Sequence, residues 1–300
     1  TVEYSTDGLS LAITYMNATQ GWIPTTDDDV TFAPSKGLAN SEGIFGFGHD
    51  GTGPYTYVST TNLVSDAGVV SSDVSGVGTA RRYVAAGGYG GDKGIFGFGD
   101  TGSVVGMTNL VSNSGVVASD VSAVGTAREG TAACSYGEDK GIFAYGSGLT
   151  NISNLVSNAG VVSSDVSGVG TARSFLAACE YGGDKGIFGF GSAGSMTNLV
   201  SNAGVVATDT TGVGTARQSL AACTYGYDKG IFGFGSGPVS MTNLVSNAGV
   251  VGTDVTGVGT ARDVLAATEY GGDKGIFGFG NPGPTAVTNL VSNAGVVATD

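Results

Sequence analysis

Short apolar runs separated by turn residues follow one another along the chain, and the same four runs keep returning. In the copy between Thr171 and Asp209 they read SFLAACEY, KGIFGFG, MTNLVS and GVVATD. Gly, Asn, Asp and Ser fill the connections, which is the composition of tight turns. No run has the 3.6-residue period of a helix, whereas each is long enough for a strand. The pattern predicts an all-β fold built from four-stranded units.

The run GIFGFG, written GIFAYG in the third copy, gives the spacing of these units. Successive copies start 51, 47, 45, 44 and 45 residues apart, with isoleucines at Ile44, Ile95, Ile142, Ile187, Ile231 and Ile276. Repeats of about 40 to 50 residues with four strands have the size of a β-propeller blade. We therefore expect a propeller of about six blades over residues 31–300. Seven blades remain an alternative because GWIPTTD, residues 21–27, resembles a further GVVATD run, and a β-solenoid is another.

Alternation within GIFGFG predicts how the units pack. Side chains two positions apart share a face of a strand, so Phe188 and Phe190 are expected on one face and Gly189 on the other. The aromatic face of one unit would then press against the glycine face of its neighbour. In the third copy Ala144 and Tyr145 replace Gly and Phe, which keeps one position small and the other aromatic.

The repeat resembles the kelch repeat, in which an arginine precedes a small-residue strand, a glycine pair and an apolar strand that ends in glycine. The residues that carry this resemblance in one copy are Arg173, Ala177, Ala178, Gly182, Gly183, Ile187, Phe188 and Gly191. The kelch pattern's tryptophan is absent, and the second glycine of the pair is replaced by Glu138 and Tyr227 in two copies. The resemblance implies kelch-like blades and no particular function.

Residues 1–30 stand apart from the repeats. Leu11, Ile13 and Tyr15 alternate with smaller residues, which predicts a β-hairpin that serves as an attachment segment. The phrase LAITYMNATQGWIPT is similar to segments of bacteriophage tail fibres and other virion surface proteins. The GIFGFG, TNLVS and GVGTAR arrays resemble predicted structural proteins of marine phages. Both resemblances imply a virion or extracellular location.

Composition limits the partners. Twelve basic residues stand against 25 acidic ones, a net charge of −13, which disfavours nucleic acid. No apolar stretch approaches the roughly 18 residues that span a bilayer, so membrane insertion is not expected. Three cysteines, Cys134, Cys179 and Cys223, occupy one register of the repeat, where equivalent positions lie too far apart for a disulfide. We expect free, buried thiols.

Candidate chemistry is sparse. His49 is the only histidine, which excludes a histidine triad or a multi-histidine metal site within one chain. Asp27, Asp28 and Asp29 lack the spacing of a calcium loop, and no GK[ST] follows the glycine runs. No metal or other cofactor is therefore expected, and the chain is predicted not to be an enzyme. The alternative is a propeller glycosidase or polysaccharide lyase, because glycoside hydrolysis needs only two carboxylates.

An arginine recurs in each TAR phrase. A ring of positive charge around a central channel is one interpretation. We favour ion pairs with the aspartates in the same repeat pattern, Asp73, Asp120, Asp165, Asp209 and Asp254. The arginines are Arg81, Arg128, Arg173, Arg217 and Arg262.

The copies differ most in the loop after GFG and in the two residues after each arginine. In a four-stranded blade both fall on one rim, and loops on a rigid scaffold commonly carry recognition. Drift in unconstrained loops is the alternative. The candidate ligand-binding residues are His49, Tyr55, Tyr57, Arg82, Tyr83, Asp100, Glu129, Phe175, Asp263 and Asn281.

These patterns predict a non-enzymatic virion or surface module, similar to a phage tail fibre, that recognises a cell-surface glycan or protein receptor through this rim. Other virion or fibre subunits are expected partners, including further copies of the chain. A purely structural fibre or filament subunit is a second alternative beside the glycosidase or lyase.

Overall fold

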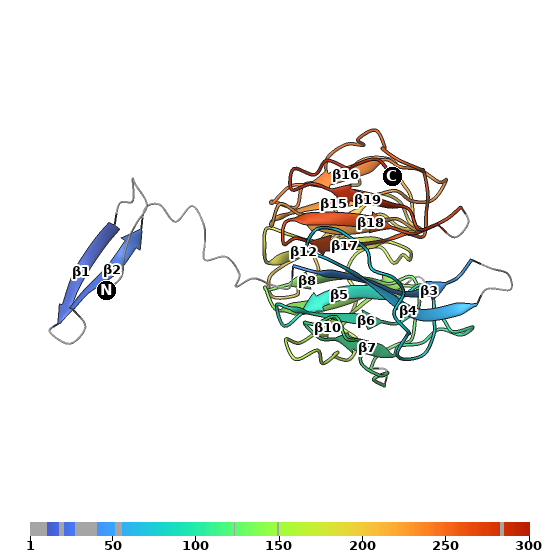
Figure 1. Cartoon of the computed structure of the whole chain (residues 1–300), viewed down its shortest axis with the longest axis horizontal. Coiled ribbons are helices and arrows are strands. Elements are labelled where there is room, and N and C mark those ends of the chain that lie inside the picture. Colours follow the sequence, from blue (N-terminus) through green and yellow to red (C-terminus); the bar gives the residue numbers. More distant parts are fainter. Residues whose placement is uncertain are drawn as a thin grey trace. The chain divides into compact units, whose positions relative to one another are not determined.

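The computed structural model describes residues 11–17, 21–27, 41–51, 56–122, 124–148, 150–282 and 285–300 (Figure 1). All regular structure in these residues is β, which confirms the all-β prediction. None of them forms a helix that could cross a membrane. The chain divides into two units, Thr1–Ala39 and Asn40–Asp300.

The first unit contains an antiparallel pair, β1 (Leu11–Asn17) and β2 (Gly21–Asp27). The pairing runs from Leu11 opposite Asp27 to Asn17 opposite Gly21, so GWIPTTD pairs with β1 along its length. Among the described strands β2 has no other partner.

The second unit repeats one antiparallel sheet in which a second strand lies between a first and a third strand. The first strands are β5 (Ala85–Tyr89), β8 (Ala132–Tyr136), β11 (Ala177–Tyr181), β14 (Ala221–Tyr225) and β17 (Ala266–Tyr270). The second strands are β3 (Gly43–His49), β6 (Lys93–Gly97), β9 (Lys140–Gly146), β12 (Lys185–Gly189), β15 (Lys229–Gly233) and β18 (Lys274–Gly278). The third strands are β4 (Tyr57–Val64), β7 (Thr108–Val111), β10 (Thr150–Val156), β13 (Thr197–Val200), β16 (Thr242–Val245) and β19 (Thr288–Val291). The β3–β4 sheet has no first strand among the described residues.

The fourth run of the repeat, GVVATD and its equivalents, is not the regular strand that the sequence predicted. It meets the third strand only at isolated bridges, such as Val200 with Val206 and Thr197 with Thr210. Between these bridges the Asn198 side chain donates from Nδ2 to the Ala207 carbonyl at 3.0 Å. The Asn198 side chain thus makes a hydrogen bond to the outer segment where a regular strand would pair through its backbone. We call this fourth segment the outer run.

Aromatic pairs join each sheet to the next. Phe98 meets Phe143 at 5.1 Å between ring centroids, Phe190 meets Phe232 at 5.2 Å, and all such pairs are edge-on. The last sheet also contacts the first one, because the ring centroids of Phe279, which follows β18, and Phe45 of β3 lie 5.2 Å apart. The remaining pairs are Phe47 with Phe96, Tyr145 with Phe188, and Phe234 with Phe277. Small sheets in sequential contact are consistent with a β-propeller-like fold.

The two aromatic residues of GIFGFG do not share a face, contrary to the sequence prediction. Phe188 packs on Tyr145 of the preceding sheet, whereas Phe190 packs on Phe232 of the following one. The reason is the backbone of Phe190, whose φ of 62° lies in the left-handed region and ends the strand alternation. Each sheet therefore offers one ring to each neighbour.

The predicted contact between aromatic rings and glycine is confirmed. A Cβ on Gly189 would lie 2.6 Å from Cζ of Phe232, closer than any real contact. Ala144 occupies the equivalent position in the third copy, and there the rings of Tyr145 and Phe188 lie 5.5 Å apart. The extra methyl group is accommodated by this wider spacing.

The three cysteines are free and buried, as predicted. Each thiol packs on a glycine of the next sheet, so that a Cβ on Gly186 would come within 2.5 Å of Cys134 Sγ. Burial raises the pKa of all three thiols.

We expect the native protein to resist thiol-reactive labelling at pH 8, because the reactive thiolate is both inaccessible and disfavoured. Mass spectrometry after labelling should show no adducts before unfolding and three afterwards. An adduct on the folded protein would contradict this packing.

Each TAR arginine is the centre of a buried cluster rather than part of a charged ring. Arg173 donates from Nε to the Phe190 carbonyl at 2.8 Å and from Nη2 to Asn198 Oδ1 at 2.7 Å. Its Nη1 lies 4.0 Å from Asp209, and its guanidinium carbon lies 4.3 Å from the Tyr145 ring centroid in the preceding sheet. We call the Thr, Arg, Asn and Asp of one repeat its arginine cluster.

The same cluster occurs in five repeats. The arginine–aspartate pairs are Arg81 with Asp120, Arg173 with Asp209, Arg217 with Asp254, and Arg262 with Asp300, while Asp165 acts on Arg128 through its charge. The predicted ion pairs are thus confirmed in four of these repeats, whereas the described Arg128 and Asp165 interact only through their charges. Asp73 is the exception, because it accepts a hydrogen bond from Asn62 and none of the described arginines pairs with it.

Candidate functional site

The two variable parts of the repeat are hydrogen-bonded to each other. Arg82, which follows the arginine of its TAR phrase, exchanges two backbone hydrogen bonds with Asp100, the first loop residue after GFG. Asp263 and Asn281 exchange the same pair of bonds in another repeat. Ser147 donates its N–H to the Glu129 carbonyl in the equivalent place. The fold therefore brings residues that vary between repeats to one edge of each sheet.

The next residue along the chain links successive sheets. Phe175 donates its backbone N–H to the Gly130 carbonyl, Ser219 donates to Phe175, and Val264 donates to Ser219, at 2.8 to 2.9 Å. All four residues have a left-handed backbone, with φ between 51° and 59°. That conformation is strained for a β-branched residue such as Val264, and strain of this kind is concentrated at functional sites.

Arg82 and Asp100 form the charged centre of this region. The Arg82 Nε donates to Asp100 Oδ2 at 2.9 Å, and the other carboxylate oxygen accepts the Gly102 N–H at 2.8 Å. The guanidinium carbon lies 4.7 Å from the Tyr83 ring centroid and 5.4 Å from that of Tyr57. Burial lowers the pKa of Arg82, but the hydrogen bond to Asp100 and the two tyrosines raise it above its ordinary value.

Glu129 supplies a second carboxylate close to this pair. Its Oε2 is buried and has no hydrogen-bond partner. Burial raises the pKa of Glu129, the charge of Asp100 raises it further, and Arg82 offsets part of the rise. A glutamic acid that holds its proton above its ordinary range can serve as a general acid.

Aromatic rings complete the region. Tyr83 and Phe175 come from sheets separated by one repeat, and their ring centroids lie only 5.2 Å apart. The intervening repeat has Gly130, where a Cβ would lie 3.1 Å from the Phe175 ring. Glycine at this position lets the two rings meet. We call Tyr57, Arg82, Tyr83, Asp100, Glu129 and Phe175 the rim cluster.

The remaining sequence candidates lie elsewhere or outside the description. His49 accepts the Gly51 N–H on Nδ1 at 3.2 Å. Asp263 and Asn281 form their own backbone pair, and the Oδ1 of Asp263 is buried without a partner. Tyr55 lies outside the described residues. Gly130 is a further residue of this region that the sequence-based candidates did not include, although glycine where other copies have Tyr, Phe, Ser or Val is a usable signal.

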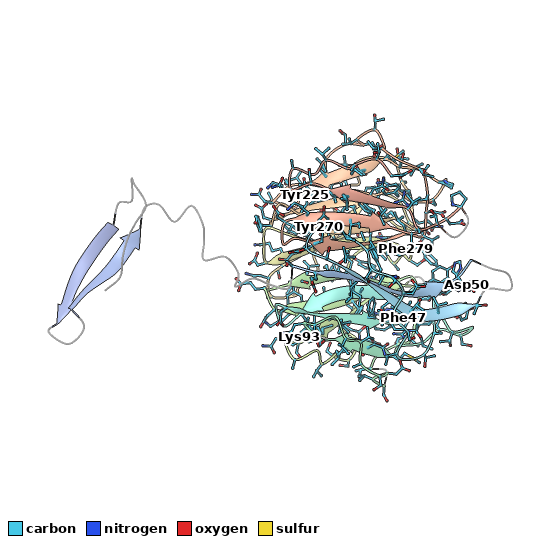
Figure 2. The ribbon with its side chains drawn as sticks, viewed as in Figure 1. Phe47, Asp50, Lys93, Tyr225, Tyr270 and Phe279 are labelled. Atoms are coloured by element: carbon cyan, nitrogen blue, oxygen red, sulfur yellow. The ribbon has the colours of Figure 1, made fainter. Side chains whose placement is uncertain are left out.

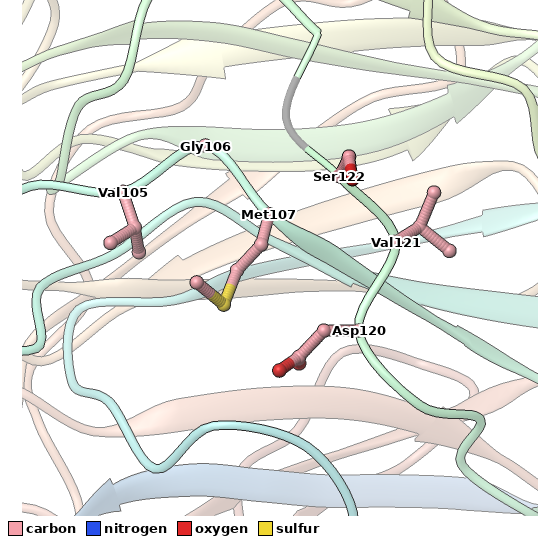
Figure 3. Close-up of a pocket in the computed structure, with 6 residues that line it drawn as sticks. All are labelled: Val105, Gly106, Met107, Asp120, Val121 and Ser122. Carbon is pink, nitrogen blue, oxygen red and sulfur yellow. The ribbon is translucent and has the colours of Figure 1, made fainter.

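A separate pocket of about 360 Å³ lies between the second variable loop and an outer run. Figure 3 shows Met107 and Asp120 pointing into the space between these two segments. Val105, Gly106, Val121 and Ser122 complete its lining. Asp120 is already engaged by Thr79 and Asn109 in an arginine cluster. The rim cluster has two carboxylates, an arginine and three aromatic rings, so it is the better candidate for a functional site.

No protein-family model and no curated protein sequence matches the chain. Two solved structures show the same fold at low sequence identity. One is titled "Structure of YjhT", with 10% identity, a TM-score of 0.63, and coverage of 85% of this chain and 93% of that one. The other is a fungal alcohol oxidase of the AA5 family in complex with copper, with 12% identity, a TM-score of 0.52, and coverage of 80% and 68%. These likenesses concern the fold alone.

The comparison corrects the prediction that the chain is not an enzyme. A fungal alcohol oxidase has a similar fold over 68% of its chain, so the fold gives no ground for excluding an enzyme. The sequence-based exclusion was wrong because it rested on the lack of histidines, and the acid–base chemistry of carboxylates needs none.

The copper of that oxidase does not fit this chain. Copper favours imidazole and thiolate ligands, but the chain has one histidine and its three thiols are buried against glycines. Within the described residues no three His, Cys, Asp or Glu side chains group as a metal site.

Proposed function

We propose that the second unit is a six-bladed β-propeller in which each repeat supplies one blade. The aromatic pairs support this count, because they link six consecutive sheets and the last pair joins Phe279 to Phe45. The outer run acts as the fourth strand of each blade, held by its two bridges and by the asparagine side chain.

We propose that the rim cluster is the active site of a glycan-cleaving enzyme, a glycosidase or polysaccharide lyase. The observation that carries this proposal is Glu129, a carboxyl group with a raised pKa and an unpartnered buried oxygen beside the Arg82–Asp100 pair. General acid catalysis of glycosidic cleavage needs a carboxyl group with these properties.

Each part of the cluster has a role in this reaction. Glu129 donates its proton to the glycosidic oxygen as that bond breaks. Asp100 is the second carboxylate, fixed by Arg82 Nε and the Gly102 N–H. In a hydrolase it takes a proton from the water whose oxygen bonds to the anomeric carbon as the glycosidic bond breaks, and in a lyase it takes the sugar-ring proton that is eliminated with the glycosidic oxygen. Arg82 also places positive charge where an acidic sugar would bind. Tyr57, Tyr83 and Phe175 offer ring surface on which sugar rings pack, as aromatic side chains commonly do in ligand sites.

We further propose a cell-surface polysaccharide as the substrate and a virion or extracellular location. The similarity of residues 11–25 to phage surface segments supports both statements. Catalysis at the rim is compatible with attachment through residues 1–30.

Incubation with a panel of acidic and neutral surface polysaccharides tests the proposed activity. Mass spectrometry should detect released oligosaccharides, with a new reducing end for a hydrolase and an unsaturated end for a lyase. Binding across the panel without any released product would refute the enzymatic proposal.

A further inference from the structure

The β3–β4 sheet differs from the other five sheets in the described part of the chain, first because no strand there pairs with the second edge of β3. In every other sheet the second strand pairs with a first strand, as β18 pairs with β17 from Ala266 opposite Gly278 to Tyr270 opposite Lys274. β3 pairs only with β4 among the described strands. An unpaired edge presents a row of backbone donors and acceptors to an incoming strand.

The arginine cluster of this sheet is also incomplete. Asn62 donates to the Ser71 carbonyl at 3.0 Å and to Asp73 at 2.8 Å, as its equivalents do. In the other five repeats the asparagine Oδ1 accepts an arginine Nη2, and the aspartate accepts a threonine N–H. Neither donor reaches Asn62 or Asp73 from the described residues, and Asn62 is partly exposed where its equivalents are fully buried.

The neighbouring β17–β18–β19 sheet also lacks a contact that the other sheets make. Five aromatic residues carry an arginine of the following repeat over their rings at 4.2 to 4.5 Å: Phe47, Phe98, Tyr145, Phe190 and Phe234. Phe279 holds the sixth equivalent position, and no described arginine covers it. Figure 2 shows Phe279 at the same end of the sheets as Phe47, while Lys93, Tyr225 and Tyr270 lie toward the other end.

A backbone hydrogen bond between successive repeats is likewise missing at this place among the described residues. In five places a glycine at the end of a second strand donates its N–H to the carbonyl of the next repeat's arginine, as Gly235 does to Arg262 at 3.1 Å. Gly280 is the sixth such glycine and has no equivalent bond among the described residues. The strand β17 is also less covered than its equivalents, with Ala266 exposed where Ala177 and Ala221 are buried.

We propose that this place is a docking slot for an extended segment with the sequence of the repeat's own opening, Thr-Ala-Arg followed by a small-residue strand. We call the β3 edge, Asn62, Asp73, Phe279 and Gly280 the open slot. The strand of the occupant pairs with β3 and covers β17. Its arginine lies over Phe279 and donates to Asn62 Oδ1, and its threonine donates to Asp73. This is strand addition to a sheet edge, with an arginine that specifies the register.

The chain itself provides the probe. A synthetic peptide with the sequence of residues 260–270, TARDVLAATEY, contains both the arginine and the strand and has no cysteine. The matched control is the same peptide with Arg262→Ala. Binding to the full chain is measured by calorimetry, and its effect on the melting temperature by circular dichroism.

We expect the first peptide to bind and to raise the melting temperature, and the control to bind at least about tenfold more weakly, because it leaves the Oδ1 of Asn62 without a donor in a covered site. Asn62→Ala in the protein should remove most of that difference between the peptides, and the affinity of each peptide is compared on the folded variant because Asn62 also holds Ser71 and Asp73. Failure of the first peptide to bind, or equal binding of both peptides, would overturn the proposal. Either result is independent of whether the rim cluster cleaves glycans.

Discussion

Replacing Glu129 with glutamine is expected to lower kcat on a cleaved polysaccharide by about 10²- to 10⁴-fold, the usual contribution of a general acid. Glutamine keeps the shape of the side chain but has no proton to donate. KM should change little, since the rings of Tyr57, Tyr83 and Phe175, on which we propose the sugars pack, remain. Initial rates of oligosaccharide release against substrate concentration give both constants.

The matched control is Glu138→Gln, which makes the same chemical change at an exposed residue in the turn between β8 and β9. Its rate and melting temperature should equal those of the unaltered protein. The assignment of Glu129 as the acid would be wrong if Glu129→Gln kept the full rate, or if both variants lost it equally.

Replacing Arg173 with alanine is expected to destabilise the second unit by about 3 to 5 kcal/mol, the usual cost of removing one partner from a buried charged network. The change leaves the Phe190 carbonyl and Asn198 Oδ1 without their donors, and it uncovers the ring of Tyr145. It also removes the positive charge beside Asp209. Equilibrium denaturation by urea, followed by far-ultraviolet circular dichroism, measures the decrease in the free energy of unfolding.

Lys185→Ala serves as the comparison, because Lys185 pairs with Asp184 at the surface and exposed ion pairs contribute little to stability. Its unfolding midpoint should stay within error of the unaltered protein. Equal midpoints for Arg173→Ala and the unaltered protein would show that the arginine clusters do not hold the sheets together.

The repeat and its packing partners were readable from the sequence because they rest on local periodicity. Alternation predicted that aromatic rings meet glycine in the neighbouring unit, as Phe232 meets Gly189, and the shared register of the cysteines predicted buried thiols. The opposite direction of Phe190 was not readable, since it depends on one left-handed φ in a non-glycine residue. The β-branched composition of the outer run predicts a strand, and it does not reveal that the Asn198 side chain takes the place of part of the backbone ladder.

For the candidate site, the sequence predicts only which positions differ between repeats and that they lie on one rim. Sequence spacing put Arg82, Asp100 and Glu129 at one edge of their sheets, but not in electrostatic contact with one another. That contact depends on how far successive sheets rotate, which no local pattern encodes. The raised pKa of Glu129 likewise follows mainly from burial, and the burial of a single carboxyl group cannot be read from composition.

The pH dependence of kcat/KM for polysaccharide cleavage tests the central claim most directly. Burial raises the pKa of Glu129, and the protonated form is the active acid, so kcat/KM should fall as the pH rises through that raised pKa. Glu129→Gln should leave a low residual rate without this alkaline decline. A rate that stays constant or increases with pH through the range above an ordinary glutamate pKa would contradict the account.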